Sequence, residues 1–181
     1  RVVVGTWGDT GAVGRAYAYD LEGPKGIEPV AMVPNPDPYD LDYFGGAVAV
    51  SGNRLVVAAS GDDNSGRDAG NAYVYDFGPT ISTVPKAMIQ AAGTAAGSSY
   101  GAAVALTGSV LAVGAPDESL GLRPRVGRVY LHHLAGATPT LPARVLSPPD
   151  EALAADMRFG TALAAAGGRL AVSAPAAGSV Y

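Results

Sequence analysis

Cysteine is absent from the 181 residues of this chain. Its absence excludes disulfide bonds and thiolate chemistry, but it does not by itself assign a redox compartment. No hydrophobic run approaches the roughly 20 residues that a membrane-spanning helix needs, so we expect no membrane insertion of this segment. The glycosylation motif Asn-x-Ser/Thr is missing as well.

Charge and histidine are also scarce. The net charge of −4 gives no reason to expect a nucleic-acid partner. The only two histidines are the adjacent pair His132 and His133. Neighbouring side chains on a strand point to opposite faces, so these two cannot share one metal ion. We interpret them as a substitution on the surface of a strand.

A segment of about 56 residues is repeated along the chain. An aromatic-Gly pair opens each of three copies, which are Phe44–Val57, Tyr100–Val113 and Phe159–Val172. A leucine follows eleven residues after each aromatic residue, at Leu55, Leu111 and Leu170. A fixed period of this size indicates stacked supersecondary units.

Each copy holds four short apolar runs. In the copy that begins at Phe44, the second run is Arg54–Ser60, the third is Gly70–Phe77, and the fourth is Lys86–Ile89. The fourth run aligns by composition with Val30–Val33 and Pro142–Val145. Short runs rich in β-branched and aromatic residues, bounded by Gly, Pro, Asp and Ser, are typical of strands.

Four antiparallel strands per repeat, the first rich in small residues, predict a β-propeller blade. The expected fold class is therefore all-β, a partial propeller with about three to four blades' worth of chain. We expect residues 1–181 to be part of a single β-propeller domain. An incomplete blade would span 1–43, full blades 44–99 and 100–158, and a second incomplete blade 159–181.

These motifs resemble FG-GAP repeats, the blades of the integrin α-subunit head, and are most similar to the bacterial and algal type. Tyr100-Gly101 together with Val113-Gly114-Ala115-Pro116 is the best copy. The resemblance implies an extracellular or cell-surface module for adhesion, scaffolding or assembly. The eleven-residue spacing leaves no room for the calcium loop that integrin-type blades often carry between their first two strands.

The arrangement of the runs also bears on the extent of the protein. The chain begins within a second run and ends within a third, so both ends supply the same strands of a blade. We expect it to be part of a longer protein. If it is the whole polypeptide, we expect an open arc whose blade edges and end faces need partners, including self-assembly through open blade edges.

One loop is a candidate metal site. Asp62, Asn64 and Asp68 alternate around Gly66, so their oxygens could converge on a hard cation such as calcium. The alternative is a solvated turn, because Asp, Asn, Ser and Gly favour turns without any metal. We expect no required cofactor, and calcium is the one candidate.

Partner binding is expected at the blade-end loops 34–43, 61–69 and 117–126, which differ between copies. The residues proposed for contact with other proteins or glycoproteins are Trp7, Asp9, Asp63, Arg67, Asp117, Arg123 and Arg125. Asp9 and Asp117 are placed in one row with Asp62. Trp7 could be an exposed stacking platform for a sugar or a partner side chain, or could pack on the neighbouring blade, which we favour.

No pattern predicts catalysis. Gly97-Ser98-Ser99-Tyr100-Gly101 matches G-x-S-x-G, but it precedes a first strand, whereas a nucleophile elbow needs a strand, a sharp turn and a helix. The sequence therefore favours a non-catalytic protein-binding module. Two alternatives stay open: an accessory propeller of a larger secreted enzyme such as a hydrolase, and a carbohydrate-binding propeller.

Overall fold

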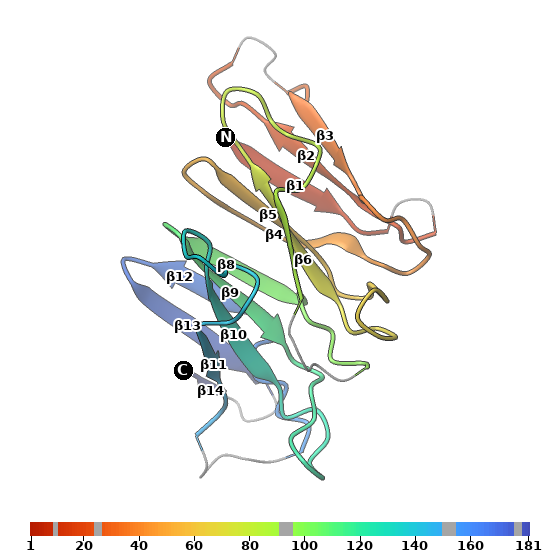
Figure 1. Cartoon of the computed structure of the whole chain (residues 1–181), viewed down its shortest axis with the longest axis vertical. Coiled ribbons are helices and arrows are strands. Elements are labelled where there is room, and N and C mark those ends of the chain that lie inside the picture. The colour runs from red at the N-terminus through yellow and green to blue at the C-terminus, as the bar shows by residue number, and fades with distance from the viewer. Residues whose placement is uncertain (9–10, 24–26, 91–95, 150–154, 176–178) are drawn as a thin grey trace.

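The computed structural model describes residues 1–8, 11–23, 27–90, 96–149, 155–175 and 179–181. Four antiparallel β-sheets stack one after another along the molecule (Figure 1). The predicted all-β class and four-stranded blades are confirmed. Among the described residues, no helix is long and apolar enough to cross a membrane.

The second sheet follows chain order, β4-β5-β6-β7. Its strands are β4 (Phe44–Ser51), β5 (Arg54–Ala59), β6 (Asn71–Asp76) and β7 (Ala87–Ile89). A two-residue turn at Gly52, where φ is +55°, joins β4 to β5. A shift of register between Phe44 and Ala47 bends the start of β4.

The third sheet has the same order, β8-β9-β10-β11. Its strands are β8 (Ala103–Thr107), β9 (Val110–Ala115), β10 (Arg128–His133) and β11 (Arg144–Leu146). Tyr130 pairs with Val145, as Tyr73 pairs with Met88 in the second sheet. The predicted alignment of the fourth run is therefore wrong by one residue here, because the alanines were matched by composition and not by hydrogen-bond register.

The two outer sheets have three strands each among the described residues. The first sheet holds β1 (Val2–Thr6), β2 (Arg15–Tyr19) and β3 (Ala31–Pro34). The fourth holds β12 (Leu163–Ala166), β13 (Arg169–Ala174) and β14 (Ser179–Val180). By register, β1 is equivalent to β5, since Val4 pairs with Tyr17 as Val57 pairs with Tyr73. β13 is equivalent to β5 as well, since it lies between β12 and β14 as β5 lies between β4 and β6.

The hydrophobic core lies between the sheets, in three clusters. Each cluster combines side chains from two neighbouring sheets. Ala16 and Ala18 of the first sheet face Leu55, Val57 and Tyr73 of the second. The small side chains at this contact let the first two sheets lie close together.

Glycines make close backbone contact between blades possible. Gly70 lies at the start of β6 with a φ of +81°, and a Cβ added there would overlap the carbonyl oxygen of Tyr100 in the next sheet. Gly14 has the same relation to Phe44, and Gly127 to Phe159. Only glycine fits both the left-handed backbone and the space, which explains why this residue recurs in the third run.

Backbone hydrogen bonds join each loop after a second strand to the loop before the next sheet. Ser99 and Tyr100 donate their N–H groups to the carbonyls of Asp68 and Ala69, at 3.2 and 2.9 Å. We name this set of bonds the inter-blade latch. Equivalent latches involve Tyr43 and Phe44, and Arg158 and Phe159.

The latch depends on left-handed backbone at non-glycine residues. Tyr43, Ser99 and Arg158, each immediately before the repeat's aromatic residue, have φ angles of 55°, 53° and 54°. Asp68 and Arg125 on the facing loops have φ angles of 51° and 47°. A left-handed conformation at each of these residues costs about 1–2 kcal/mol of folding free energy. The backbone hydrogen bonds of the latch must offset that cost.

Candidate functional site at the loop face

The loops after β1, β5 and β9 lie along one edge of the stack, and the β4–β5, β8–β9 and β12–β13 hairpins lie along the opposite edge (Figure 1). We call the first edge, made of loops 7–14, 60–70 and 116–127 and the loops latched to them, the loop face. It contains all the residues predicted to bind a partner that the structure describes, which leaves out Asp9. The latches give this variable surface a fixed backbone, which is how rigid scaffolds commonly present binding loops.

Trp7 is the largest exposed side chain of the loop face. It follows β1, is 55 % exposed, and makes an edge-to-face contact with Tyr43, with ring centroids 5.8 Å apart. Trp7 therefore meets the neighbouring blade through Tyr43, as the preferred expectation has it, while more than half of its surface stays exposed. Tyr39 and Leu41 are exposed on the loop that carries Tyr43.

Asp62, the first of the predicted metal ligands, is 1 % exposed. Its Oδ2 accepts a hydrogen bond from the Tyr73 hydroxyl at 2.5 Å, and its Oδ1 accepts one from the Asn64 N–H at 2.9 Å. Desolvation by burial, followed by the bond to Asp62, raises the pKa of Tyr73. Asp62 therefore fixes the loop onto the interior of the blade.

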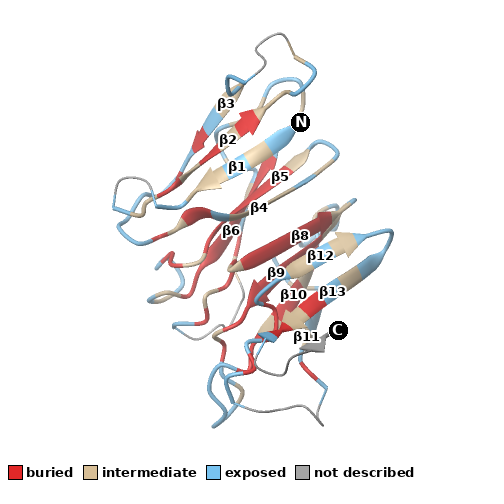
Figure 2. Ribbon diagram, turned by 180° about the vertical axis from the view of Figure 1, so that it is seen from behind, coloured by how far each residue is buried: buried red, intermediate tan, exposed pale blue. Residues whose placement is uncertain are grey.

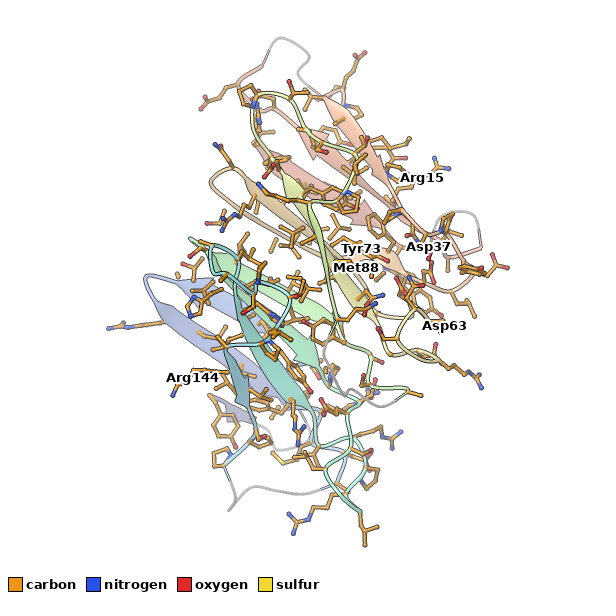
Figure 3. The ribbon with its side chains drawn as sticks, in the orientation of Figure 1. Arg15, Asp37, Asp63, Tyr73, Met88 and Arg144 are labelled. Carbon is orange, nitrogen blue, oxygen red and sulfur yellow. The ribbon has the colours of Figure 1, made fainter. Side chains whose placement is uncertain are left out.

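The other acidic side chains of this loop are turned to other contacts. The Asp68 carboxylate forms an ion pair with Arg67 at 3.5 Å, and Asp63 Oδ1 accepts a bond from the Asp68 N–H at 2.7 Å. Asp63 lies at the outer edge, away from Tyr73 (Figure 3). In the ranges that the structure describes, no three His, Cys, Asp or Glu side chains are grouped to hold a metal ion. Calcium at Asp62, Asn64 and Asp68 stays a prediction.

The third sheet repeats the carboxylate–tyrosine pair with Glu118. The Tyr130 hydroxyl donates to Glu118 Oε2 at 2.7 Å, and Arg128 Nη1 donates to Oε1 at 2.9 Å. Burial raises the pKa of Glu118, against the lowering effect of its two donors. The predicted row of carboxylates thus continues through Glu118 and not through Asp117, because Glu118 follows the last residue of β9, Ala115, at the same distance along the chain as Asp62 follows the last residue of β5, Ala59. The third predicted member, Asp9, lies outside the described residues.

Asp117 instead links two sheets. Arg158 donates to its Oδ1 at 2.7 Å, and the Ser99 hydroxyl donates to Oδ2 at 2.9 Å. Arg125, also predicted to contact a partner, pairs with Asp156 at 2.5 Å. The arginines of this region are thus largely matched by carboxylates, while Arg123 lies exposed at the tip of the loop.

His132 is fully buried, so its interpretation as a surface residue is wrong; His133 is exposed. Nδ1 of His132 lies 3.3 Å from the Pro139 carbonyl, which can only accept, so the neutral ring carries its proton there. Nε2 then accepts from the Tyr100 hydroxyl at 2.8 Å. A histidine thus occupies the slot of Tyr75 and provides an acceptor for a buried aromatic hydroxyl.

We expect the free energy of unfolding to depend on pH through His132. Burial lowers the pKa of His132 in the folded state. The neutral His132 side chain therefore contributes its full stabilisation above the unfolded-state pKa near 6.5, and the free energy of unfolding falls as the pH drops below that value. Relative to His132→Gln, the wild type should lose at most about 1.4 kcal/mol between pH 6.5 and 5.5. Urea unfolding at both pH values measures this, with His133→Gln as the exposed control. Identical pH dependence in wild type and His132→Gln would contradict the assignment.

Two buried carboxylates of the loop face, those of Asp62 and Glu118, each accept a hydrogen bond from a tyrosine hydroxyl. Ser99, the serine of the G-x-S-x-G pattern, donates to Asp117. The latches, which sequence reasoning missed, carry no shared side-chain type at their left-handed positions, so no sequence signal marks them.

Residues 32–75, from β3 through most of β6, match the family model described as FG-GAP repeat. No curated protein matches this chain.

Proposed function

Because the chain carries an FG-GAP repeat at residues 32–75, within a stack of β-propeller blades, we propose that it is a non-catalytic protein-binding module of the cell surface or extracellular space. Its partners are proteins or glycoproteins that contact the loop face. Adhesion, scaffolding and assembly are the roles that such a module performs.

The single observation that carries this proposal is the exposure of large apolar side chains on a fixed backbone. Trp7 is exposed and contacts Tyr43, whose loop also carries the exposed side chains of Tyr39 and Leu41. Leu122 is fully exposed at the tip of the third-sheet loop. Trp and Tyr are the residues most enriched at binding hot spots. Exposed aromatic side chains on loops held by backbone bonds lose little conformational entropy when a partner binds.

The exposed indole of Trp7 also favours a second candidate, a carbohydrate ligand. Sugars stack on indole faces because a ring offers apolar C–H groups on one side and hydroxyl groups at its edge. Asp37 and Asp40 are exposed on loop 35–43, the loop that also carries Tyr39 and Tyr43, and offer acceptors for such hydroxyls.

We expect Trp7→Ala to abolish partner binding without unfolding the chain. Truncation of a central anchor costs 2 kcal/mol or more, about a 30-fold loss of affinity. The measurement is capture from the extracellular fraction of the source cells by the immobilised chain, followed by quantitative mass spectrometry. Val84→Ala is the matched control, since Val84 is 71 % exposed in the loop between β6 and β7, on the opposite edge.

Two outcomes discriminate the candidates. Loss of the same captured proteins with Trp7→Ala, and their retention with Val84→Ala, supports protein binding at the loop face. Binding to a glycan array that Trp7→Ala removes supports the carbohydrate ligand instead. Equal capture by wild type, Trp7→Ala and Leu122→Ala would exclude the loop face as the binding surface.

A further inference from the structure

Two carboxylates lie buried where the loops of the first two sheets meet. Figure 2 shows the buried residues concentrated in the strands of the middle sheets, but Asp42 and Asp62 belong to loops and are only 2 % and 1 % exposed. Gly61, the neighbour of Asp62, donates its N–H to the Asp42 carbonyl at 3.1 Å. We call this contact between the loops 35–43 and 60–70 the first joint. A buried charge is costly unless it is paired or coordinates a metal ion.

The first joint supplies hydrogen bonds to these carboxylates but no positive charge. Asp42 Oδ2 accepts from Asn35 Nδ2 at 2.7 Å and from the Tyr39 N–H at 2.8 Å. Asp62 accepts from the Tyr73 hydroxyl and from a backbone N–H. Within the part of the chain that the structure describes, neither carboxylate forms an ion pair with Lys, Arg or His. Two negative charges are therefore buried together without a counter-charge.

The two carboxylates are close enough to repel each other. Burial is the main cause that raises the pKa of Asp42, and the negative charge of Asp62 raises it further, against the lowering effect of its two donors. Repulsion between buried like charges is relieved by a cation that both can face.

An amide without a partner faces the same place. Asn71 opens β6 and is fully buried, and neither its Nδ2 nor its Oδ1 makes a hydrogen bond of normal geometry to a described residue. Desolvation is the main cause that raises the pKa of Tyr73, followed by the bond to Asp62, while the side-chain amides of Asn64 and Asn71 act to lower it. Both amides therefore lie beside the Tyr73 hydroxyl, which donates to Asp62.

The third sheet balances the equivalent carboxylate with an arginine. Arg128 has the register position of Asn71, since each pairs with the last residue of the strand before it. Its Nη1 donates to Glu118, which stands in the place of Asp62. The first sheet also has an arginine at this position, Arg15. The second sheet thus has a neutral amide where its two neighbours have a guanidinium.

The second carboxylate is also particular to the first joint. At the second joint, between the second and third sheets, Ser98 stands in the place of Asp42, because its carbonyl accepts from the Asp117 N–H as that of Asp42 accepts from Gly61. The Ser98 hydroxyl donates to the Ala69 carbonyl at 3.1 Å and carries no charge. The second joint therefore holds one carboxylate and one guanidinium, whereas the first holds two carboxylates and an amide.

We propose that the first joint binds a divalent cation that takes oxygen ligands, with Asp62 and Asn71 as ligands and Asp42 as the second negative charge. Calcium fits this set, because it accepts carboxylate and amide oxygens in flexible geometry, whereas magnesium demands a near-ideal octahedron and keeps several waters. The set shares only Asp62 with the loop residues Asp62, Asn64 and Asp68 predicted from the sequence. The cation links the loops 35–43 and 60–70 across the inter-blade latch.

The first test is the Tm of the chelator-treated chain, alone and with CaCl2, MgCl2 or NaCl at matched ionic strength. Calcium at about ten to a hundred times its Kd should raise the Tm by about 3–10 °C, because a ligand that binds only the folded state stabilises it. Magnesium should raise the Tm less. Calorimetric titration gives the Kd. A chain that responds to calcium no more than to sodium overturns the cation site. No partner protein is involved, so this result is independent of the proposed function.

Asn71→Arg places the third-sheet residue beside Asp62. Its guanidinium should pair with the carboxylate and take the place of the cation. The Tm of the metal-free variant should therefore exceed that of the metal-free wild type by several degrees, and calcium should no longer raise it. Damage to the fold alone would lower the metal-free Tm. Calcium binding with unchanged affinity would overturn the role of Asn71.

Asp42→Ser gives a second test with a residue that the fold already accommodates at the second joint. It should weaken calcium binding at least tenfold, because affinity rises with the number of charged ligands. Asp68→Asn is the matched comparison, since Asn tolerates the left-handed backbone at Asp68, where φ is 51°. It should leave calcium binding unchanged. Loss of binding in Asp68→Asn and its retention in Asp42→Ser would place the cation in the exposed loop and overturn the first joint as its site.

Discussion

Gly70→Ala should lower the stability of the chain by about 3 kcal/mol or more, a fall of about 6–12 °C in Tm. Two effects add at this position. The φ of +81° is costly for any residue with a Cβ, and the new Cβ would overlap the carbonyl oxygen of Tyr100. Because that oxygen belongs to the next sheet, the blades must separate to relieve the overlap. Thermal unfolding followed by circular dichroism gives the measurement.

Gly52→Ala is the matched control for this prediction. Gly52 has a φ of +55° in the β4–β5 turn, but nothing lies within 4 Å of the position that a Cβ would take. The Gly52→Ala variant should therefore lose only the free energy that a left-handed backbone costs a residue with a Cβ, about 1 kcal/mol. Equal losses at Gly52 and Gly70 would show that backbone conformation, and not the approach of neighbouring blades, explains the glycine of the repeat.

Glu118→Ala should destabilise the chain by about 2–4 kcal/mol, because it removes the acceptor of a buried hydroxyl and the counter-charge of a partly buried arginine. Tyr130 is 3 % exposed, so its hydroxyl cannot find water in compensation. Arg128 keeps some access to solvent, with a side chain 34 % exposed, and loses less. Urea unfolding measures the change.

Two further variants apportion the Glu118 effect. Glu118→Gln keeps an acceptor for the Tyr130 hydroxyl and loses only the charge, so it should cost about half as much as Glu118→Ala. Tyr130→Phe removes the hydroxyl, and together with Glu118→Ala it should cost less than the sum of the single losses by about 1 kcal/mol. Strict additivity would mean that the hydroxyl and the carboxylate do not stabilise each other.

The strands were predictable from the sequence because their signals are local. The apolar runs around Leu55 and Leu111 are bounded by Gly and Pro, and they predicted the strands and their antiparallel pairing. The glycines at positions 70 and 127 recurred because their role is steric and permits no substitute. Residue identity in these cases reports directly on backbone geometry.

Other features could not be read from the sequence because they depend on contacts between distant residues. The inter-blade latch uses main-chain groups, so Tyr43, Ser99 and Arg158 share a conformation without sharing a side-chain property. Asp117 was placed in one row with Asp62, but the residue that binds Tyr130 as Asp62 binds Tyr73 is the next one, Glu118. His132 is buried because it replaces a tyrosine in the register, and adjacency to His133 concealed this.

The inter-blade latch has a consequence for how such a molecule can change. Its hydrogen bonds run from N–H to carbonyl, and they hold whichever side chains occupy the joint. A loop of this kind can accumulate substitutions in its exposed residues while its path stays fixed. The exposed loop residues can therefore be substituted, and the partner that they recognise can change, with little loss of stability in the blades.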